Sequence, residues 1–225
     1  MLYAIGDIHG RLDKLDALLA ALPLRPDDRL VFLGDYVDRG PDSRGVVDRL
    51  LEVAERHPAV FLMGNHESMF LDFIGWEGPH YFGADVFVAN GGAETLLSYD
   101  WFETPEPRLR NFRLPPAHER FFRSLRLHHV EGDFLFVHAG LGRALLRSDH
   151  LDQALRRARP EELLWDRSTL DAPHRLGVTI VYGHTPRADF GVRWNPPYSI
   201  GIDTGAVYGG PLTAIRLPDE TLFQV

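Results

Sequence analysis

Six polar side chains follow short apolar runs of this sequence, and all six are of types that bind metal ions. Together they supply two carboxylates, one amide oxygen and three imidazoles: Asp7, Asp35, Asn65, His9, His138 and His184. Imidazole binds Zn, Fe and Mn-like ions, whereas carboxylates and water bind harder ions. Six ligands are too many for one catalytic ion that must also bind a substrate. The set therefore predicts two ions, about 3.5–4 Å apart, that clamp a phosphoryl group during its displacement.

The spacing of these residues indicates how they would divide between the two ions. Asp7 and His9 are two positions apart, so both can reach the first ion. Asp35 is the natural bridging carboxylate, which leaves the remaining three residues for the second ion. Two carboxylates do not neutralise two divalent ions, so the centre stays cationic. A water molecule held between the ions should then lose a proton near neutral pH and attack phosphorus.

Each of these residues taken alone has an ordinary explanation. Asp7 follows a glycine, as in many turns, His9 has the look of a surface histidine, and Asn65 is a common turn residue. The metal hypothesis therefore depends on five motifs in order, each at the end of an apolar run. The other histidines fit no ligand spacing and are expected to be ordinary: His57, His80, His118, His128, His129, His150 and His174.

Five apolar runs must position the predicted ligands. Continuous apolar runs bounded by turn residues are typical of strands that are buried on both faces of an α/β sandwich. If the runs enter one site in the same direction, their carboxyl ends bring the polar side chains to a common rim. The predicted strands are residues 2–5, 30–33, 60–63, 134–137 and 178–182.

Helical patterns separate the first three of these strands. Leucine and valine side chains recur at helical spacing over residues 12–22 and 43–57, which predicts a β-α-β-α-β order up to residue 63. The end of the chain differs, because residues 198–202, 212–215 and 222–225 form three consecutive apolar runs. We expect these three runs to be consecutive strands that give the sheet an antiparallel end.

The middle of the chain, at about residues 68–129, is predicted to be an irregular insertion within a single domain of residues 1–225. It has a loop-like run at 103–107 and a helix opening at Pro115 and Pro116. We expect it to pack over the catalytic face. Its aromatic side chains predict a small core of its own, with the alternative that one or two line the substrate entrance: Phe70, Phe73, Trp76, Tyr81, Phe82, Phe87, Trp101 and Phe102.

The composition excludes several kinds of chemistry. The 225 residues contain no cysteine, so disulfides, thiolate metal sites and cysteine nucleophiles are absent. A net charge of -8 disfavours a nucleic-acid partner. The single lysine, Lys14, lies in no phosphate-binding loop. The sequence contains no run of 18 apolar residues, so no membrane span is predicted. No leader peptide is recognisable either, so a cytoplasmic location is expected. The oligomeric state is not indicated.

The motifs resemble those of the PPP-type metallophosphatases, within the calcineurin-like metallophosphoesterase superfamily. The similarity is strongest to small bacterial and phage serine/threonine protein phosphatases. It implies an α/β (α+β) fold with a central β-sandwich flanked by helices, and a dinuclear centre in which Mn is favoured and Fe or Zn are alternatives. The motifs are GDIHG at 6–10, GDYVDRG at 34–40, GNHE at 64–67, HAG at 138–140 and GHTP at 183–186, with NGG at 90–92, LWDR at 164–167 and IDTGAVY at 202–208.

The resemblance also implies which residues hold the two metals. It assigns the first metal to Asp7, His9 and Asp35. Asp35 also serves the second metal, together with the three ligands that come later in the chain: Asn65, His138 and His184.

Further residues acquire catalytic or phosphate-binding roles from the same resemblance. His66 would be the general acid and Asp38 its orienting partner, although Asp38 has the alternative of an ion pair with Arg39 or Arg44. Arg39 and Arg167 would grip the phosphate, since a guanidinium can bind two phosphate oxygens at once. Two assignments stay open: Arg175 competes with Arg167, and Tyr208 is either part of the phosphate pocket or an ordinary tyrosine.

The resemblance favours a metal-dependent serine/threonine protein phosphatase, with a phosphorylated protein or peptide or a small phosphoester as its partner. The alternative is a symmetrical diadenosine tetraphosphate hydrolase, a related enzyme in which the motif residue matching Glu67 is usually Asp and the last motif usually reads GHW. This chain has Thr185 after His184, so both departures favour the phosphatase. A catalytically silent binding module is a third hypothesis, disfavoured because every predicted ligand, the acid and both arginines are present.

Overall fold

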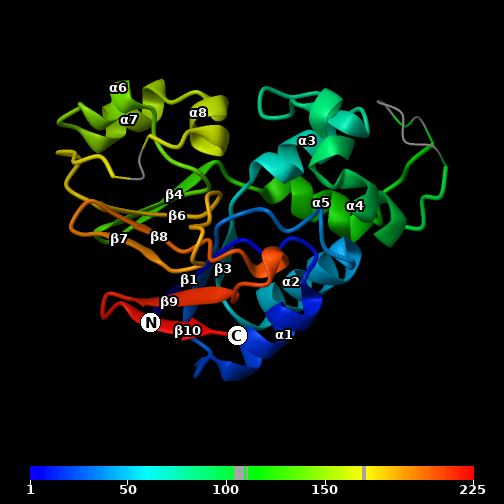
Figure 1. The fold of residues 1–225 in the computed structure, drawn as a ribbon, viewed down its shortest axis with the longest axis horizontal. Coiled ribbons are helices and arrows are strands. Elements are labelled where there is room, and N and C mark those ends of the chain that lie inside the picture. The colour runs from blue at the N-terminus through cyan, green and yellow to red at the C-terminus, as the bar shows by residue number, and fades with distance from the viewer. Residues whose placement is uncertain (104–108, 110, 169–170) are drawn as a thin grey trace.

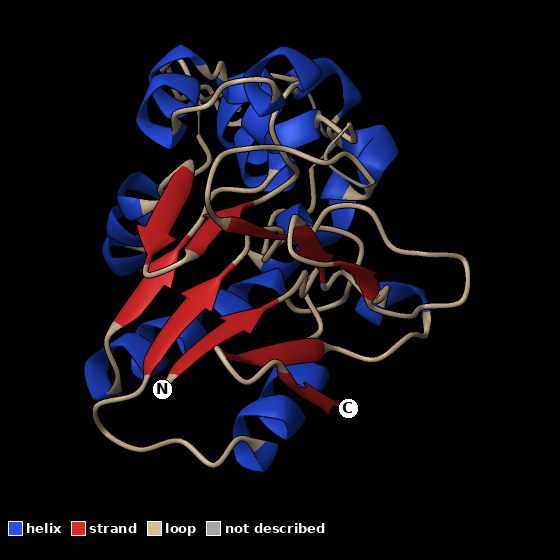
Figure 2. Ribbon diagram, turned by 90° about the vertical axis from the view of Figure 1, so that its left-hand side faces the viewer, coloured by secondary structure: helices blue, strands red, loops and turns tan. Residues whose placement is uncertain are grey.

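The computed structural model describes residues 1–103, 109, 111–168 and 171–225. Within these ranges, ten strands form two five-stranded sheets, and helices lie outside them (Figures 1 and 2). The predicted α/β fold, a central β-sandwich flanked by helices, is thus confirmed. Among the described residues, no helix combines the length and the apolar character that crossing a membrane requires.

The first sheet joins a parallel half to an antiparallel half. Its strands, in spatial order, are β10 (Thr221–Gln224), β9 (Thr213–Leu217), β1 (Leu2–Ile5), β2 (Arg29–Phe32) and β3 (Ala59–Phe61). β1, β2 and β3 run parallel to one another, whereas β9 pairs antiparallel with both β1 and β10. The carboxyl ends of the three parallel strands therefore point to one edge.

The second sheet has a parallel centre and antiparallel edges. Its strands, in spatial order, are β4 (His128–Glu131), β5 (Phe134–Val137), β6 (Thr179–Tyr182), β8 (Ser199–Gly201) and β7 (Arg193–Asn195). β5, β6 and β8 are parallel, and β4 and β7 pair antiparallel with β5 and β8. All five strands that precede the predicted ligand motifs thus lie next to a parallel neighbour: β1, β2 and β3 in the first sheet, and β5 and β6 in the second.

The helices include the predicted ones and several others. α1 (Leu12–Ala21) and α2 (Ser43–Arg56) agree with the predicted helices to within one residue at each end, and α5 (Pro116–Ser124) begins at the predicted prolines. The remaining helical segments are α3 (Asn65–Phe73), η1 (Ala84–Val86), η2 (Val88–Asn90), α4 (Gly92–Ser98), α6 (Arg143–Leu146), α7 (Leu151–Arg157), α8 (Pro160–Trp165) and η3 (Ala206–Tyr208).

Three apolar layers explain why the strand sequences are continuously apolar. Ala4 and Val31 of the first sheet pack against Phe136 and Val181 of the second, between the two sheets. The outer face of the first sheet packs on α1 to α5, and the outer face of the second packs on α6 to α8. Because successive side chains point to opposite faces, a strand with both faces covered needs apolar residues at every position.

The end of the chain differs from the prediction of three consecutive antiparallel strands. β9 and β10 form the predicted antiparallel pair in the first sheet. β8, predicted as their neighbour, instead lies in the second sheet and runs parallel to β6. Residues 202–212 connect the two sheets past the ligand motifs, with Gly205 and Gly209 at positive φ. An apolar run alone does not specify which of two sheets its strand joins.

The predicted insertion at about residues 68–129 does not have a separate aromatic core. Phe70, Phe73 and Phe87 are buried in the same apolar cluster as Leu15 of α1 and Val47 of α2. Trp76 and Tyr81 line a cavity of about 700 Å³ beyond the end of α3. The aromatic side chains extend the main core because α4 and α5 pack directly on α2. The loop predicted at 103–107 lies, apart from Glu103, outside the described residues.

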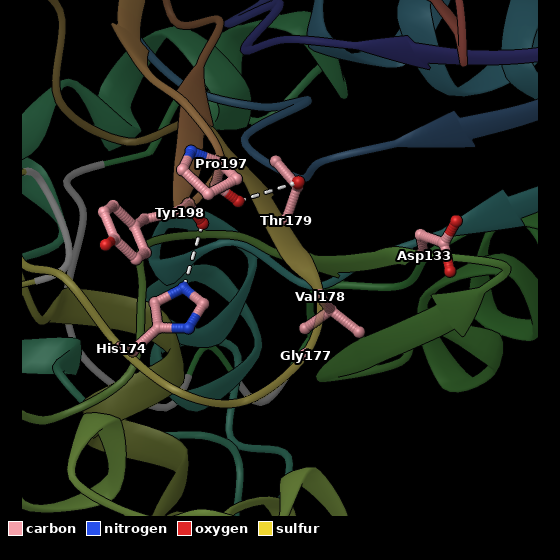
Figure 3. A pocket seen from close by; sticks show the side chains of 7 residues that line it. All are labelled: Asp133, His174, Gly177, Val178, Thr179, Pro197 and Tyr198. Atoms are coloured by element: carbon pink, nitrogen blue, oxygen red, sulfur yellow. Dashed lines mark hydrogen bonds between the residues drawn. The ribbon is translucent and has the colours of Figure 1, made fainter.

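A hollow of about 190 Å³ lies at the amino end of β6 (Figure 3). There the Thr179 hydroxyl donates a hydrogen bond of 2.9 Å to the Pro197 carbonyl, and His174 Nε2 donates one of 2.9 Å to the Tyr198 carbonyl (Figure 3). His184 follows the carboxyl end of the same strand. The hollow is therefore at the opposite end of β6 from the predicted ligands.

Candidate metal centre

The loops that follow the strands hold their polar residues in unusual backbone conformations. His9, Asp35, Asp38, Arg39 and His184 all have φ between 46° and 71°. Non-glycine residues adopt this left-handed region rarely, and such residues cluster at functional sites where the surrounding structure holds them. Of the eight described non-glycine residues with positive φ, five are residues that the sequence singled out.

Two of the imidazoles are oriented by backbone carbonyl groups. His9 Nδ1 donates a hydrogen bond of 2.9 Å to the Val37 carbonyl, and His138 Nδ1 donates one of 2.8 Å to the Leu33 carbonyl. Because a carbonyl can only accept, each ring must carry its proton on Nδ1. Nε2 of each ring then faces the centre, as in metal-binding histidines whose other nitrogen is hydrogen-bonded.

Asp35 lies between these two imidazoles. Its Oδ2 is 3.4 Å from His9 Nε2, and its Oδ1 is 3.4 Å from His138 Nε2. Burial disfavours the charge on Asp35, but the surrounding imidazoles of His138, His66 and His9 together outweigh burial and hold the pKa of Asp35 well below its usual range. An ionised carboxylate between two oriented nitrogens has the geometry of the predicted bridging ligand.

The potential ligand atoms fall into two groups that share Asp35. Within each group the atoms lie no more than 4.8 Å apart: His9, Asp35 and His66 in one, and Asp35, His138 and His184 in the other. Asn65 joins the second group, because its Oδ1 is 3.0 Å from His138 Nε2 and 3.0 Å from His184 Nδ1. All four residues predicted for the second ion are therefore together.

The first group differs from the predicted set at one position. His66 stands in it where Asp7 was predicted. The Asp7 carboxylate is turned toward the second sheet, and its Oδ2 accepts a hydrogen bond of 2.9 Å from the His184 backbone N–H. A Cβ atom on Gly183 would lie 2.0 Å from Asp7 Oδ1. The loop between β6 and His184 therefore needs a glycine at this approach.

The chemistry of the buried atoms fits divalent cations. Among the described residues, Asp7 Oδ1 and His184 Nε2 are buried and have no hydrogen-bond partner. Buried polar atoms are costly unless something satisfies them. Burial and the neighbouring Asp203 raise the pKa of Asp7 well above its usual range, and burial raises the pKa of Asp203 to about 6. A bound cation would stabilise the ionised form of these adjacent buried carboxylates, which burial alone disfavours.

His66 and Asp38 form a buried pair. His66 Nδ1 is 2.7 Å from Asp38 Oδ2, and the side chains are 1% and 0% exposed. Burial lowers the pKa of His66 to about 4 and raises that of Asp38 well above its usual range. Burial therefore favours the pair in its overall neutral state, with one proton shared between Nδ1 and Oδ2 and another on Nε2. Neither alternative ion pair of Asp38 is formed in the described part of the chain: Arg39 contacts His9, and Arg44 pairs with Asp100 at 2.8 Å.

The predicted phosphate-binding residues lie around the two groups. Arg39 Nη1 donates to His9 Nε2 at 2.6 Å, and the Arg39 guanidinium carbon is 5.5 Å from the centre of the Tyr208 ring. Arg167 is exposed, and its charge is one of the effects that, after burial, lower the pKa of His184 to about 3. Arg175 is exposed in the segment that precedes β6. Arg39 and Tyr208 thus border the first group, and Arg167 lies near the second.

Sequence reasoning missed three supporting residues. The buried Glu67 carboxylate accepts backbone hydrogen bonds from Gly64 at 2.8 Å, Asp35 at 2.9 Å and Tyr36 at 2.7 Å. Asp203 is buried near Asp7, and Thr95 is buried against Asp38. Glu67 lies within the GNHE motif and Asp203 within the IDTGAVY motif, so the sequence did mark both positions. Thr95 has an ordinary residue type within the expected insertion, where nothing marked it.

Comparison with protein families gives a match over most of the chain. Residues 2–209 match the family model described as calcineurin-like phosphoesterase. Two similar curated proteins are asymmetrical bis(5'-nucleosyl)-tetraphosphatases, from Anoxybacillus flavithermus at 29% identity and from Bacillus cereus at 31% identity. In both cases the alignment covers 98% of this chain and 92% of the relative.

Solved structures give the same picture of the fold. A protein assigned provisionally as a diadenosine tetraphosphatase is 25% identical with a TM-score of 0.68, and the match covers 100% of this chain and 92% of that one. A protein serine/threonine phosphatase from Saccharomyces cerevisiae is 19% identical with a TM-score of 0.62, covering 100% of this chain and 78% of that one. At 19% identity, the second likeness concerns the fold alone.

Proposed function

From the premise that this chain belongs to the calcineurin-like phosphoesterase family, and is therefore a phosphoester hydrolase of a metal-dependent kind, we propose that its principal substrates are dinucleoside tetraphosphates. The observation that carries hydrolysis is the sharing of Asp35 by two groups of potential ligands. The observation that favours this substrate class is the name of the relatives, which align with nearly the whole chain.

The residues of the site would hold and orient the participants. Divalent ions bound there would supply charge neutralisation for phosphate oxygens and activation of a water molecule. Asp35 would contribute to both ions, with His9 on one side and His138 on the other, each fixed by its carbonyl partner. Asp7 would complete the first ligand set. We propose Mn as the first metal to test, with Fe and Zn next.

Arg39 and Arg167 would bind the phosphate oxygens from two sides. A guanidinium keeps its charge at every working pH and can donate two parallel hydrogen bonds to phosphate. Arg39 borders the first ligand group and stacks near Tyr208, and Arg167 influences His184 of the second group. A phosphate that contacts both groups would therefore meet one arginine at each end.

The preference for a dinucleotide substrate changes the ranking that the motifs alone suggested. The motifs favoured a serine/threonine protein phosphatase, with the symmetrical tetraphosphate hydrolase as the alternative. The curated relatives carry the asymmetrical name. An asymmetrical cut of a tetraphosphate releases a monophosphate and a triphosphate, whereas a symmetrical cut releases two diphosphates. The reaction products therefore distinguish the two modes directly.

Phosphoserine and phosphothreonine are a second candidate substrate class, favoured by the His66–Asp38 pair. An alkoxide is a poor leaving group and needs a proton as its bond to phosphorus breaks. The Nε2 proton of His66 would pass to that leaving oxygen as its bond to phosphorus breaks. The oxygen that bonds to phosphorus would be that of a hydroxide, formed when water loses a proton to the solvent. A phosphoanhydride leaving group needs such help less. A built general acid thus has more to contribute to ester hydrolysis.

A substrate panel with and without metal tests both proposals. Purified protein, treated with chelator and then supplied with Mn²⁺, would be assayed on diadenosine tetraphosphate, a phosphoserine peptide and p-nitrophenyl phosphate. We expect metal-dependent turnover, fastest on the tetraphosphate, with AMP and ATP as products. Faster release from the phosphoserine peptide would favour the second candidate. Metal-independent or absent turnover on all three would contradict both.

A further inference from the structure

We propose that Thr95 is a positioning residue for catalysis: its hydroxyl holds the Asp38 backbone and carboxylate so that His66 is aimed at the leaving oxygen. The proposal rests on the hydrolase function above, but on neither of its two substrate classes. Thr95 lies in α4, within the segment that sequence reasoning treated as an insertion. The hydrogen bonds of its hydroxyl to described residues go to Asp38 and Ser43, which are not predicted metal ligands.

The Thr95 hydroxyl binds Asp38 at two points. It donates a hydrogen bond of 2.6 Å to Asp38 Oδ1 and accepts one of 2.8 Å from the Asp38 backbone N–H. The Ser43 hydroxyl lies 3.0 Å from Thr95 Oγ1 and also accepts from the Asp38 N–H at 3.1 Å. All three residues have exposed fractions of 0%. Solvent therefore has no access with which to replace a hydroxyl removed from this cluster.

These contacts fix the carboxylate that orients His66. Asp38 Oδ1 is taken by Thr95, and Oδ2 is 2.7 Å from His66 Nδ1. With one oxygen anchored, the carboxylate cannot rotate without breaking a buried hydrogen bond, which costs about 1–3 kcal/mol. The direction of the His66 ring, and so of its unpartnered Nε2, is then set from α4.

The same segment also holds the neighbouring Arg39. Asp38 and Arg39 have φ of 71° and 69°, so two consecutive non-glycine residues are left-handed. The Arg39 backbone N–H donates a hydrogen bond of 2.9 Å to the carbonyl of Gly91, the residue just before α4. Gly91 has φ of 92°, and a Cβ there would lie 2.8 Å from Arg39 Cγ. The strained loop is thus pinned at both residues by one short stretch, residues 91–95.

This arrangement gives a physical meaning to the NGG motif at residues 90–92. The motif is a turn, in which Asn90 Nδ2 donates a hydrogen bond of 2.9 Å to the Val86 carbonyl. The turn starts α4 at Gly92 and brings Thr95, one helical turn later, against Asp38. Residues 91–95 therefore accept hydrogen bonds from the backbone N–H groups of Asp38 and Arg39, just as Glu67 accepts them from the loop that contains Asp35. Without these partners the N–H groups would be unpaired in a strained loop.

The test compares Thr95→Val, which removes the hydroxyl, with Thr95→Ser, which keeps it. The substrates are phenyl phosphate and p-nitrophenyl phosphate, since phenolate needs a proton more than p-nitrophenolate does. We expect Thr95→Val to lower kcat/KM about 10- to 100-fold on phenyl phosphate and several-fold less on p-nitrophenyl phosphate. Thr95→Ser should restore most of the loss. Thr179→Val, which removes a hydroxyl at the far end of β6, should stay near wild type.

A double variant separates positioning from general destabilisation. If Thr95 acts through His66, Thr95→Val should cost no more than about twofold in a His66→Asn background. Equal losses on the two aryl phosphates, or full additivity with His66→Asn, would overturn the proposal. If Thr95→Val does not fold, Ser43→Ala should show the same leaving-group dependence in weaker form, and its absence there would also overturn it. Wild-type turnover of the aryl phosphates keeps these outcomes independent of the natural substrate.

Discussion

Arg39 is the side chain on which phosphate binding should depend most. It borders the first ligand group through its 2.6 Å contact with His9. Arg39→Ala should weaken inhibition by inorganic phosphate about 10- to 100-fold, because charge-assisted hydrogen bonds contribute roughly 1.5–3 kcal/mol. The inhibition constant measured with p-nitrophenyl phosphate checks this expectation. An unchanged constant would show that Arg39 does not hold the phosphate.

Arg167 and Arg175 are matched candidates for the second phosphate contact. Both are exposed, and only Arg167 is seen to influence a site residue, through the pKa of His184. Arg167→Ala should therefore raise the phosphate inhibition constant about tenfold, whereas Arg175→Ala should leave it within about twofold. The two variants carry the same charge change, so general electrostatics cancels between them. A larger effect of Arg175→Ala would reverse the assignment.

The residues that could be predicted from the sequence are those whose own types bear the chemistry. Imidazoles, carboxylates and an amide at the ends of apolar runs indicated Asp35, His138 and their partners, and these side chains do lie together. Thr95 and Asp203 were not predicted, because a hydroxyl or carboxylate that acts on backbone or on another side chain has no distinctive spacing. The ligand and catalytic roles themselves stay predictions until the variants are measured.

At the scale of single elements, the loop after β2 depends on a carboxylate from α3. Glu67 accepts hydrogen bonds from three backbone N–H groups of that loop, those of Asp35, Tyr36 and Val37, at 2.7–3.2 Å. Glu67→Gln would turn an amide N–H₂ toward donors and should lower the free energy of unfolding by about 1–3 kcal/mol. Denaturant titration of the metal-free protein measures this change in the free energy of unfolding. Glu55→Gln, on the exposed side of α2, is the control and should change stability by less than about 0.5 kcal/mol.

The loop after β6 should be equally sensitive to added volume. A Cβ at residue 183 would meet Asp7 Oδ1 at 2.0 Å. Gly183→Ala should therefore displace Asp7 and weaken Mn²⁺ binding, measured by calorimetry, about 10- to 100-fold, the range seen when ligand-orienting contacts are lost. Gly191→Ala, where the nearest atom is 3.2 Å away, is the control. Equal affinities for the two variants would mean that Asp7 is not a ligand.

The elements were predicted with uneven success for a physical reason. Strands such as β1 and β5 are apolar at every position because both faces are covered, so their bounds were predicted to the residue. β8 was assigned to the wrong sheet, because burial is the same in either one. β7 was missed, since at the edge of its sheet only part of it is buried.

At the scale of the whole molecule, metal binding should stabilise the fold. The site gathers buried carboxylates in a chain whose net charge is already -8. Mn²⁺ at about 100 times its Kd should add about 2.7 kcal/mol, which corresponds to roughly 5–10 °C in Tm for a domain of this size. Thermal unfolding with chelator and with Mn²⁺ measures the shift. His138→Ala should remove most of it, and equal Tm values for the wild type would contradict a structural contribution of the metal.

The hydrogen bond from the His184 N–H to Asp7 has a consequence for when activity can arise. It joins residues that are 177 positions apart, one after a strand of the first sheet and one after a strand of the second. Contacts of such long range form slowly and late, because closing so large a loop opposes them. A chain still emerging from the ribosome would lack the His184 half of the centre until most of its length had been made. Catalysis should therefore switch on as one of the last events of folding, so that the onset of turnover during refolding reports docking of the two sheets.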